Sequence, residues 1–294
     1  MTANCTNAQL LANGVQVVDA SGLNETSVLL TNGQFLSGAT GLPPIAAVFA
    51  ASTNIVVTSG AGNVTIGTSP ARIATIVTTV FSSSGTFTPN AKCIFAIVEC
   101  VGGGGGGGGG SVTSSQVSCG GGGGGGAYTI GIYTAAQLSP NIAVTVGAAG
   151  TGFAGSTGLP GGNTTFGALA TANGGSGGPV VTTAAAFAFV AGGAGASTGT
   201  GTISYGLAGS SGNIGRAARP GTDALRFCAS GSGGISQLGC ANGPAIWNRG
   251  GTGGSAAAAF GCGGSGAVLR DISGTRTGGN GFSGAVVVTE FRTF

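Results

Sequence analysis

The first 80 residues contain short runs of β-branched and other apolar residues, each bounded by Gly, Asn, Asp or Ser. Runs of this length and composition between turn-forming residues are typical of β-strands. The pattern predicts strands at Val15–Val18, Val28–Leu30, Ile55–Val57, Val64–Ile66 and Ile73–Val80. Within 53–67, two alternating runs flank Ser-Gly-Ala-Gly, which predicts a hairpin.

Residues 1–80 offer short strands and no helical pattern with which to build a core. We expect Leu42-Pro-Pro-Ile45 to interrupt regular structure, because proline lacks an N–H group. An isolated hairpin is marginally stable in water, so these strands need apolar surface from elsewhere. We therefore expect 1–80 to be an N-terminal β shaft for attachment and oligomerisation, with an intertwined three-fold arrangement as the natural solution.

Residues 81–294 contain four more apolar runs that predict strands, and glycine-rich sequence separates them. The runs are Cys93–Val101, Ala127–Tyr133, Ile142–Val146 and Gly284–Phe294. The first and last match in apolar character, so we expect them to pair and close this C-terminal domain on itself. The expected fold class is mainly β, with essentially no α-helix.

Glycine in this region is not randomly placed. Two uninterrupted tracts occupy Gly102–Gly110 and Gly120–Gly126. Elsewhere glycine recurs at every third position, in three runs that begin at Gly152, Gly206 and Gly278. Three residues per turn is the period of a polyproline II-type helix, and an edge made of glycine lets neighbouring helices approach to backbone contact. The pattern predicts a bundle of short polyglycine II helices.

Collagen also places glycine at every third position, but with abundant proline between the glycines. Here the triplet runs are short, strands interrupt them, and proline is scarce. A flexible linker would have no reason to keep the triplet phase. The packed bundle is the better interpretation, with collagen and linker as the weaker alternatives.

Composition changes this picture in two respects. With 66 glycines in 294 residues the chain approaches the composition of disordered segments, yet its mean hydropathy is +0.44 and only 5% of its residues are charged. Disorder is therefore not expected. The net charge of +3 comes from scattered arginines and a single lysine, which does not form the basic cluster that nucleic-acid binding needs.

The start of the chain lacks the charged and apolar regions of a secretory signal, and no apolar run is long enough to cross a bilayer. We therefore expect folding in a cytoplasm, without membrane insertion.

Most catalytic sites are excluded by composition, because the chain has no histidine. Seven cysteines show no paired metal spacing, so we interpret them as buried apolar residues and expect no metal and no cofactor. Glu99 and Glu290 would become neighbours if the first and last strands pair, which is the one candidate carboxylate pair. Charge balance with Lys92 and Arg292 is the better explanation, so we predict a protein without enzymatic activity.

One segment of the C-terminal region departs from the glycine period and is rich in arginine and aromatic residues, which dominate binding hot spots. Loops on rigid scaffolds often carry recognition, although these side chains could equally fill gaps in the fold. The candidate binding residues are Tyr205, Arg216, Arg219, Arg226, Phe227, Trp247, Asn248 and Arg249.

Two stretches of the chain contain ordered sets of short motifs. Asn32-Gly-Gln-Phe-Leu-Ser-Gly-Ala-Thr-Gly-Leu-Pro-Pro-Ile-Ala-Ala, followed by Asn63-Val-Thr-Ile-Gly, resembles a repeat of phage tail fibres. The second stretch runs from Gly85-Thr-Phe-Thr-Pro, through the glycine tracts and Gly162-Asn-Thr-Thr-Phe-Gly, to Gly279-Asn-Gly-Phe-Ser-Gly-Ala-Val-Val-Val-Thr-Glu-Phe. This order is similar to the glycine-rich domain that ends many tail fibres and receptor-binding adhesins.

The resemblance implies a virion tail-fibre protein that attaches to the host cell. It implies a homotrimer that contacts other tail or baseplate proteins and binds a host surface glycan or outer-membrane protein. The alternatives are a purely structural fibre, tail or capsid-decoration protein, and a glycine-rich cell-wall or matrix protein. The last would require export, for which the sequence shows no signal.

Overall fold

The computed structural model describes most of the chain, and it divides into two compact units, Met1–Arg72 and Ile73–Phe294. The strand predicted at the end of the first domain belongs to the second unit, so the boundary lies eight residues (81 − 73) before the expected start at residue 81. The described residues are 14–18, 24–29, 34–39, 42–48, 55–60, 63–68, 73, 75–113, 116–183, 187–218, 227–239, 250–270 and 273–293.

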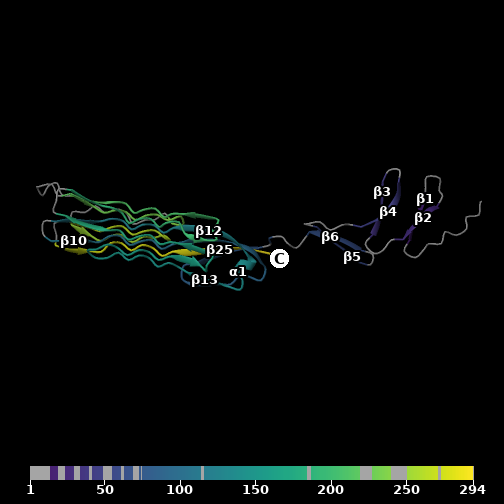
Figure 1. The fold of residues 1–294 in the computed structure, drawn as a ribbon, viewed down its shortest axis with the longest axis horizontal. Coiled ribbons are helices and arrows are strands. Elements are labelled where there is room, and N and C mark those ends of the chain that lie inside the picture. Colours follow the sequence, from purple (N-terminus) through teal and green to yellow (C-terminus); the bar gives the residue numbers. More distant parts are fainter. Residues whose placement is uncertain are drawn as a thin grey trace, which may run out of the picture. The chain divides into compact units, whose positions relative to one another are not determined.

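The first unit contains three separate antiparallel pairs of strands (Figure 1). The predicted hairpin is confirmed, since Gly60 pairs with Asn63 next to the turn. The pairs are β1 (Gly14–Val18) with β2 (Asn24–Leu29), β3 (Gln34–Ala39) with β4 (Leu42–Val48), and β5 (Ile55–Gly60) with β6 (Asn63–Thr68).

The two prolines do not interrupt regular structure, so that expectation was wrong. Pro43 and Pro44 lie inside β4, where Leu42 pairs with Ala39 and Ile45 pairs with Ser37. The register shifts at this point, and a two-stranded sheet has only edge strands. Proline is tolerated at bulges and sheet edges because its missing N–H is not needed there.

The second unit is built on a five-stranded antiparallel sheet, which we call the proximal sheet, in the order β19-β12-β9-β25-β7. The predicted pairing of the first and last strands is confirmed, because β25 lies directly beside β9. Its strands are β7 (Thr75–Phe81), β9 (Cys93–Val101), β12 (Tyr128–Thr134), β19 (Tyr205–Leu207) and β25 (Ala285–Arg292).

One face of the proximal sheet packs against a second five-stranded sheet and forms the main core. Tyr133, Phe166, Val98 and Val288 are fully buried there, because strand alternation directs every second side chain inward. The second sheet contains β8 (Gly85–Phe87), β13 (Ile142–Thr145), β14 (Thr164–Phe166), β15 (Ala170–Ala172) and β18 (Thr200–Gly201), and the short helix α1 (Ala135–Leu138) lies nearby.

Three smaller sheets lie at the opposite end of this unit, which we call the distal end (Figure 1). Val117, Cys119, Val190, Cys228 and Val268 form a second core there. The first sheet contains β11 (Val117–Gly120), β16 (Val180–Thr183), β22 (Gly251–Thr252) and β23 (Val268–Arg270); the second, the distal sheet, contains β17 (Phe187–Val190), β20 (Gly215–Ala218) and β21 (Phe227–Ala229); the third contains β10 (Gly110–Val112) and β24 (Gly274–Arg276).

Extended glycine-rich segments connect the two ends, and they have the predicted period of three. In the first tract, Gly102 and Gly105 donate N–H bonds to 124–127, whereas Gly103 and Gly106 donate to 159–162. Gly104 donates to Phe282 in a third neighbouring segment. These bonds are between 2.8 and 2.9 Å long. The bundle is therefore ordered by backbone hydrogen bonds between segments, as expected for polyglycine II.

The two pure glycine tracts are the interior of this bundle, and every residue of both is buried. The first tract also accepts bonds from three further segments, through the N–H groups of Gly150, Gly175 and Gly264. The second tract likewise donates to three segments and accepts from three others. A segment surrounded on every side has no edge where a Cβ would fit, so glycine is required throughout 102–109 and 120–126, where an added Cβ would overlap backbone atoms.

Outer segments need glycine only on the edge that faces the interior. A Cβ on Gly278 or Gly281 would overlap a carbonyl oxygen of the first tract, and one on Gly209 would overlap a carbonyl oxygen of the second. One triplet run is not a single helix. Gly155 has φ of +67° and lies in a turn, so the run that begins at Gly152 spans two antiparallel segments.

Candidate binding surface

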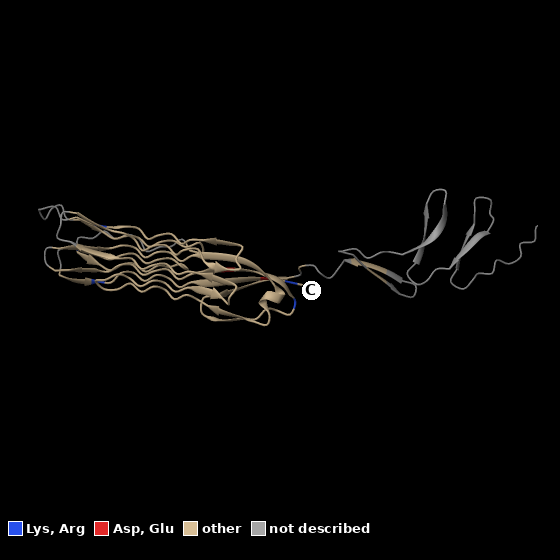
Figure 2. Ribbon diagram, viewed as in Figure 1, with Lys and Arg blue, Asp and Glu red and all other residues tan. Residues whose placement is uncertain are grey.

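The charged residues that the structure describes in the second unit lie at its two ends (Figure 2). The described extended segments between the ends carry none. The described distal strands contain three arginines, Arg216, Arg270 and Arg276. Any recognition that depends on charge therefore belongs to the ends of this unit.

The outward face of the distal sheet is aromatic. Phe187 and Phe189 alternate on β17, and their exposed fractions are 63% and 65%. In the strand register, Phe187 lies opposite Ala218, which in turn lies opposite Phe227. Phe189 lies opposite the exposed Arg216. Phe187, Phe189, Arg216 and Phe227 therefore share one face of three adjacent strands, which we call the distal face.

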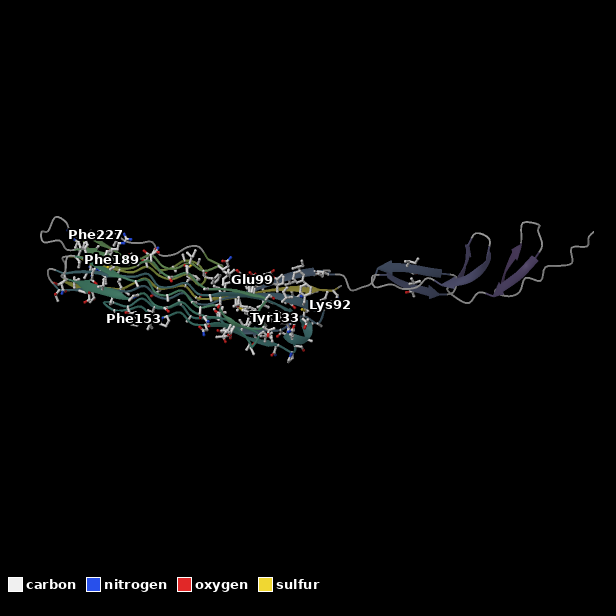
Figure 3. The ribbon with its side chains drawn as sticks, turned by 45° about the horizontal axis from the view of Figure 1, so that its top comes forward. Lys92, Glu99, Tyr133, Phe153, Phe189 and Phe227 are labelled. Carbon is white, nitrogen blue, oxygen red and sulfur yellow. The ribbon has the colours of Figure 1, made fainter. Side chains whose placement is uncertain are left out.

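The other face of the same sheet fixes these side chains in place. Val190, Ala217 and Cys228 alternate with the distal-face residues and are buried in the second core. The Cys228 thiol also donates to the Ser118 carbonyl oxygen at 2.8 Å, which ties the sheet to β11. Figure 3 shows Phe189 and Phe227 together at the distal end, on a support that the glycine bundle holds. The side chains of the distal face are therefore held in position without a bound ligand.

Of the three candidate binding residues that the structure describes, it brings two together on one sheet, Arg216 and Phe227. The candidates outside the described residues are Arg219, Arg226, Trp247, Asn248 and Arg249.

Tyr205 is not part of the distal face. It lies on β19, at the edge of the proximal sheet, where its side chain is 57% exposed. The seven residues 208–214 lie between β19 and β20. In an extended helix that rises about 3.1 Å per residue, seven residues span about 22 Å. Tyr205 therefore lies at the other end of the unit from Arg216.

Phe187 and Phe189 were missed by sequence reasoning. The signal was available, because Phe-Ala-Phe-Val alternates large and small residues in an alanine- and glycine-rich stretch. Such alternation predicts a strand with both phenylalanines on one face. It does not indicate which face is exposed, since that depends on the strands beside it.

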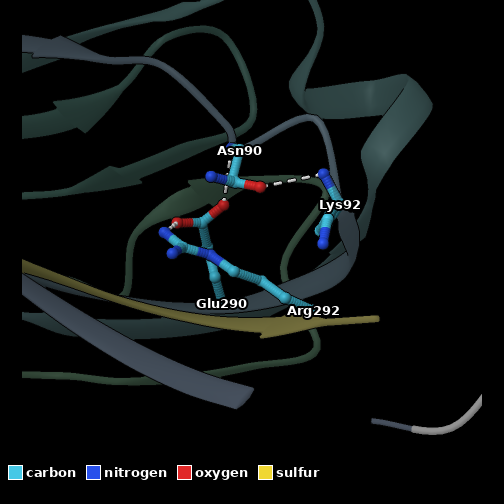
Figure 4. A network of polar contacts seen from close by, with 4 residues as sticks. All are labelled: Asn90, Lys92, Glu290 and Arg292. Carbon is cyan, nitrogen blue, oxygen red and sulfur yellow. Dashed lines mark hydrogen bonds and ion pairs between the residues drawn. The ribbon is translucent and has the colours of Figure 1, made fainter. Parts of the chain in front are cut away.

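The candidate carboxylate pair does not form. Glu99 lies opposite Val287, and Glu290 lies opposite Ala96, so the two acids project from opposite faces of the proximal sheet. Glu290 accepts the Asn90 N–H at 2.9 Å and is paired with Arg292, as predicted, while Lys92 donates its N–H to Asn90 (Figure 4). Glu99 accepts a 2.6 Å bond from the Tyr128 hydroxyl, so its partner is a phenol and not a cation. Glu99 and Glu290 are therefore separate structural contacts.

The five cysteines that the structure describes, Cys93, Cys100, Cys119, Cys228 and Cys262, are all buried. The hydrogen bond between the Cys119 and Cys228 thiols lowers the pKa of Cys228 and raises that of Cys119. Burial raises the pKa of Cys100 to about 12, and burial also raises the pKa of Cys93. A thiol with a raised pKa is a poor nucleophile because little thiolate forms at neutral pH.

Neither a metal site nor a membrane span is found among the residues that the structure describes. No group of three or more His, Cys, Asp or Glu side chains is placed to hold a metal ion in this part of the chain. Its helices also include none that is long and apolar enough to cross a membrane.

The fold and the distal face together define a glycine-rich structural domain that presents a rigid surface at one end. The family model of the glycine-rich domain matches residues 78–290, which is well over half of the chain. The protein therefore belongs to the glycine-rich domain family. A search of curated proteins found no match to this chain.

Proposed function

We propose that this protein is a tail-fibre component of a virus particle that attaches the particle to the surface of its host cell. The observation that carries the proposal is the distal face, with Phe187, Phe189 and Phe227 beside Arg216 on a rigid support. Aromatic and arginine side chains are the residue types that dominate binding hot spots. The resemblance of both parts of the chain to tail-fibre sequences supports the same function.

The glycine bundle suits this task because backbone contacts, and few side-chain contacts, hold it together between its ends. Binding costs less free energy when the contact residues are already held in place, since fewer rotamers and loops are ordered on association. The ligand we propose is a host surface glycan or an outer-membrane protein. Both can bind an aromatic surface, by stacking of sugar rings or by burial of apolar side chains.

The proposed role is binding without catalysis. The two strand-borne acids, Glu99 and Glu290, lie on opposite faces of a sheet and are engaged in separate contacts. In the virion, we propose, the protein forms a homotrimer and contacts other tail or baseplate proteins. Its assembly would take place in the cytoplasm of the host.

The test is binding of the fluorescently labelled protein to a panel of bacterial strains, measured by flow cytometry. We expect saturable binding to at least one strain. Phe189→Ser should weaken it about 30-fold or more, because truncation of a hot-spot residue costs roughly 2 kcal/mol. Leu159→Ser is the control, since Leu159 is 48% exposed on an extended segment outside the distal face and should bind normally.

Two results would count against attachment through the distal face. Equal loss of binding in the Phe189 and Leu159 variants would place the receptor site elsewhere or show a general defect. Binding to no strain, together with failure to block adsorption of any phage, would favour a purely structural virion role.

A further inference from the structure

The outer face of the proximal sheet, opposite the main core, is apolar and open. Ile76 and Val80 on β7 and Ile132 on β12 are exposed by 59%, 56% and 58% and share this face. Strand register places further partly buried apolar residues between them. These residues are Phe95, Ile97, Ile130, Val287 and Phe291, with Phe95 stacked on Phe291 at a ring-centroid distance of 4.4 Å.

The polar groups on this face are already engaged with one another. The Glu99 carboxylate accepts from Tyr128, and the hydroxyls of Thr78 and Thr289 lie 3.2 Å apart. Glu99 is the one carboxylate on this face among the described residues, and its partner is a neutral hydroxyl. Away from Glu99, a surface that covers this face must be largely apolar.

The edge of the sheet beside this face is also unprotected. β7 reads Thr-Ile-Val-Thr-Thr-Val-Phe, and in the described structure it pairs only with β25. Exposed edge strands are normally guarded by lysine, proline or a bulge, because open backbone groups pair with other chains. β7 has none of these residues, and its register with β25 is continuous.

We propose that this outer face and the β7 edge form the interface between copies of this chain. The area of the outer face is of the order that a stable interface between two proteins needs. Four strands about 4.8 Å apart and seven residues long, at about 3.4 Å per residue, cover roughly 450 Å². One partner contributes about 800 Å² to a standard stable interface, so the face supplies more than half of that area.

The part of the chain that precedes β7 favours a second copy of this chain, over another partner, as the molecule that covers the face. The first unit is three two-stranded pairs, and each pair is its own sheet within one chain. Ile66 on β6 is 56% exposed. Small hairpins of this kind become stable when their apolar sides pack on further strands. Copies of the same chain provide those strands at the same time as they cover the face that starts at β7.

The test is the mass of the full-length protein in solution, measured by sedimentation velocity over a range of concentrations. We expect a mass that is a multiple of the 27.3 kDa monomer. The double variant Ile76→Glu, Ile132→Glu should raise the dissociation constant by about 100-fold or more, because charges would be buried in an apolar interface. Both positions are exposed within one chain, so the monomer should still fold, which circular dichroism checks.

Leu159→Glu is the matched control, because Leu159 is 48% exposed on an extended segment outside this face. It should leave the mass unchanged. A second measurement is the reaction of Thr78→Cys with a maleimide, which should be slow in the assembly and fast in the double variant. Slow labelling in a monomeric protein would mean that the same chain covers the face.

A monomer at all concentrations, or an oligomer that the double variant does not weaken, would overturn the interface. Neither result bears on attachment, because the distal face and its Phe189 variant are tested separately on cells. Loss of cell binding with an intact oligomer would likewise leave the interface standing.

Discussion

At the scale of single residues, the space left for a Cβ decides where glycine is required. In the first tract a Cβ on Gly105 would overlap the carbonyl oxygen of Ser176 in a neighbouring segment. At the end of the same tract, the Cβ of an alanine at Gly110 would lie 3.6 Å from its nearest neighbours, which is ordinary contact. Both positions belong to one glycine tract, yet their tolerance differs, because only Gly105 is surrounded by other extended segments.

This contrast predicts the outcome of two alanine substitutions. Gly105→Ala should destabilise the protein by about 3 kcal/mol or more, because backbone atoms must move to relieve the overlap. Gly110→Ala should change stability by less than about 1 kcal/mol. Urea unfolding followed by fluorescence measures both. Similar losses in the two variants would argue against close packing of the interior segments.

At the scale of elements, an extended glycine segment is held almost entirely by its neighbours. It has no hydrogen bonds of its own, since the bonds of polyglycine II run between helices. Ordering glycine also costs more backbone entropy than ordering any other residue. Each interior segment offsets this cost by bonding to several others at once, so the bundle should form and melt as a unit.

Hydrogen exchange should show this cooperativity. With selective ¹⁵N-glycine labelling, the amides of Gly103–Gly108 should exchange only through global unfolding, because all are buried and bonded to other segments. Gly85, which is exposed near the start of the unit, serves as the comparison and should exchange faster. Rapid exchange within the interior tract would contradict a cooperative bundle.

At the scale of the whole molecule, buried groups that must stay protonated link stability to pH. Burial raises the pKa of Cys100 from 9.0 to about 12 and that of Tyr133 from 10.0 to about 12. Burial also raises the pKa of Tyr128. Above pH 9 the unfolded chain loses these protons while the folded chain keeps them. The unfolded state then binds fewer protons, so stability falls as pH rises.

The free energy of unfolding should therefore change little between pH 7 and 8.5 and fall between pH 9 and 12. Each group adds at most about 1.4 kcal/mol per pH unit. Cys100→Ala should make the fall shallower, because one of the groups is removed. Urea titrations at pH 7, 8.5, 10 and 11 provide the measurement. Stability that stays constant to pH 11 would show that these groups are accessible in the folded protein.

Several features were readable from the chain because they depend on local patterns. Alternating apolar residues predicted the strands around Cys93–Val101 and Gly284–Phe294, and matched character predicted their pairing. Triplet glycines predicted extended segments in backbone contact. Local chemistry misled at two places. The prolines of β4 are accommodated at an edge, and Gly155 keeps the triplet phase while forming a turn.

The sequence by itself determined the strands, the three-residue period and the scarcity of residues that could form a catalytic or metal site, because each follows from the residue and its near neighbours. The tertiary structure determined which residues and segments are neighbours in space. Register alone put Glu99 and Glu290 on opposite faces and placed Phe189 beside Arg216. Burial alone distinguished the interior glycine tracts from the outer segments, because the number of neighbours around a segment is set by the whole bundle.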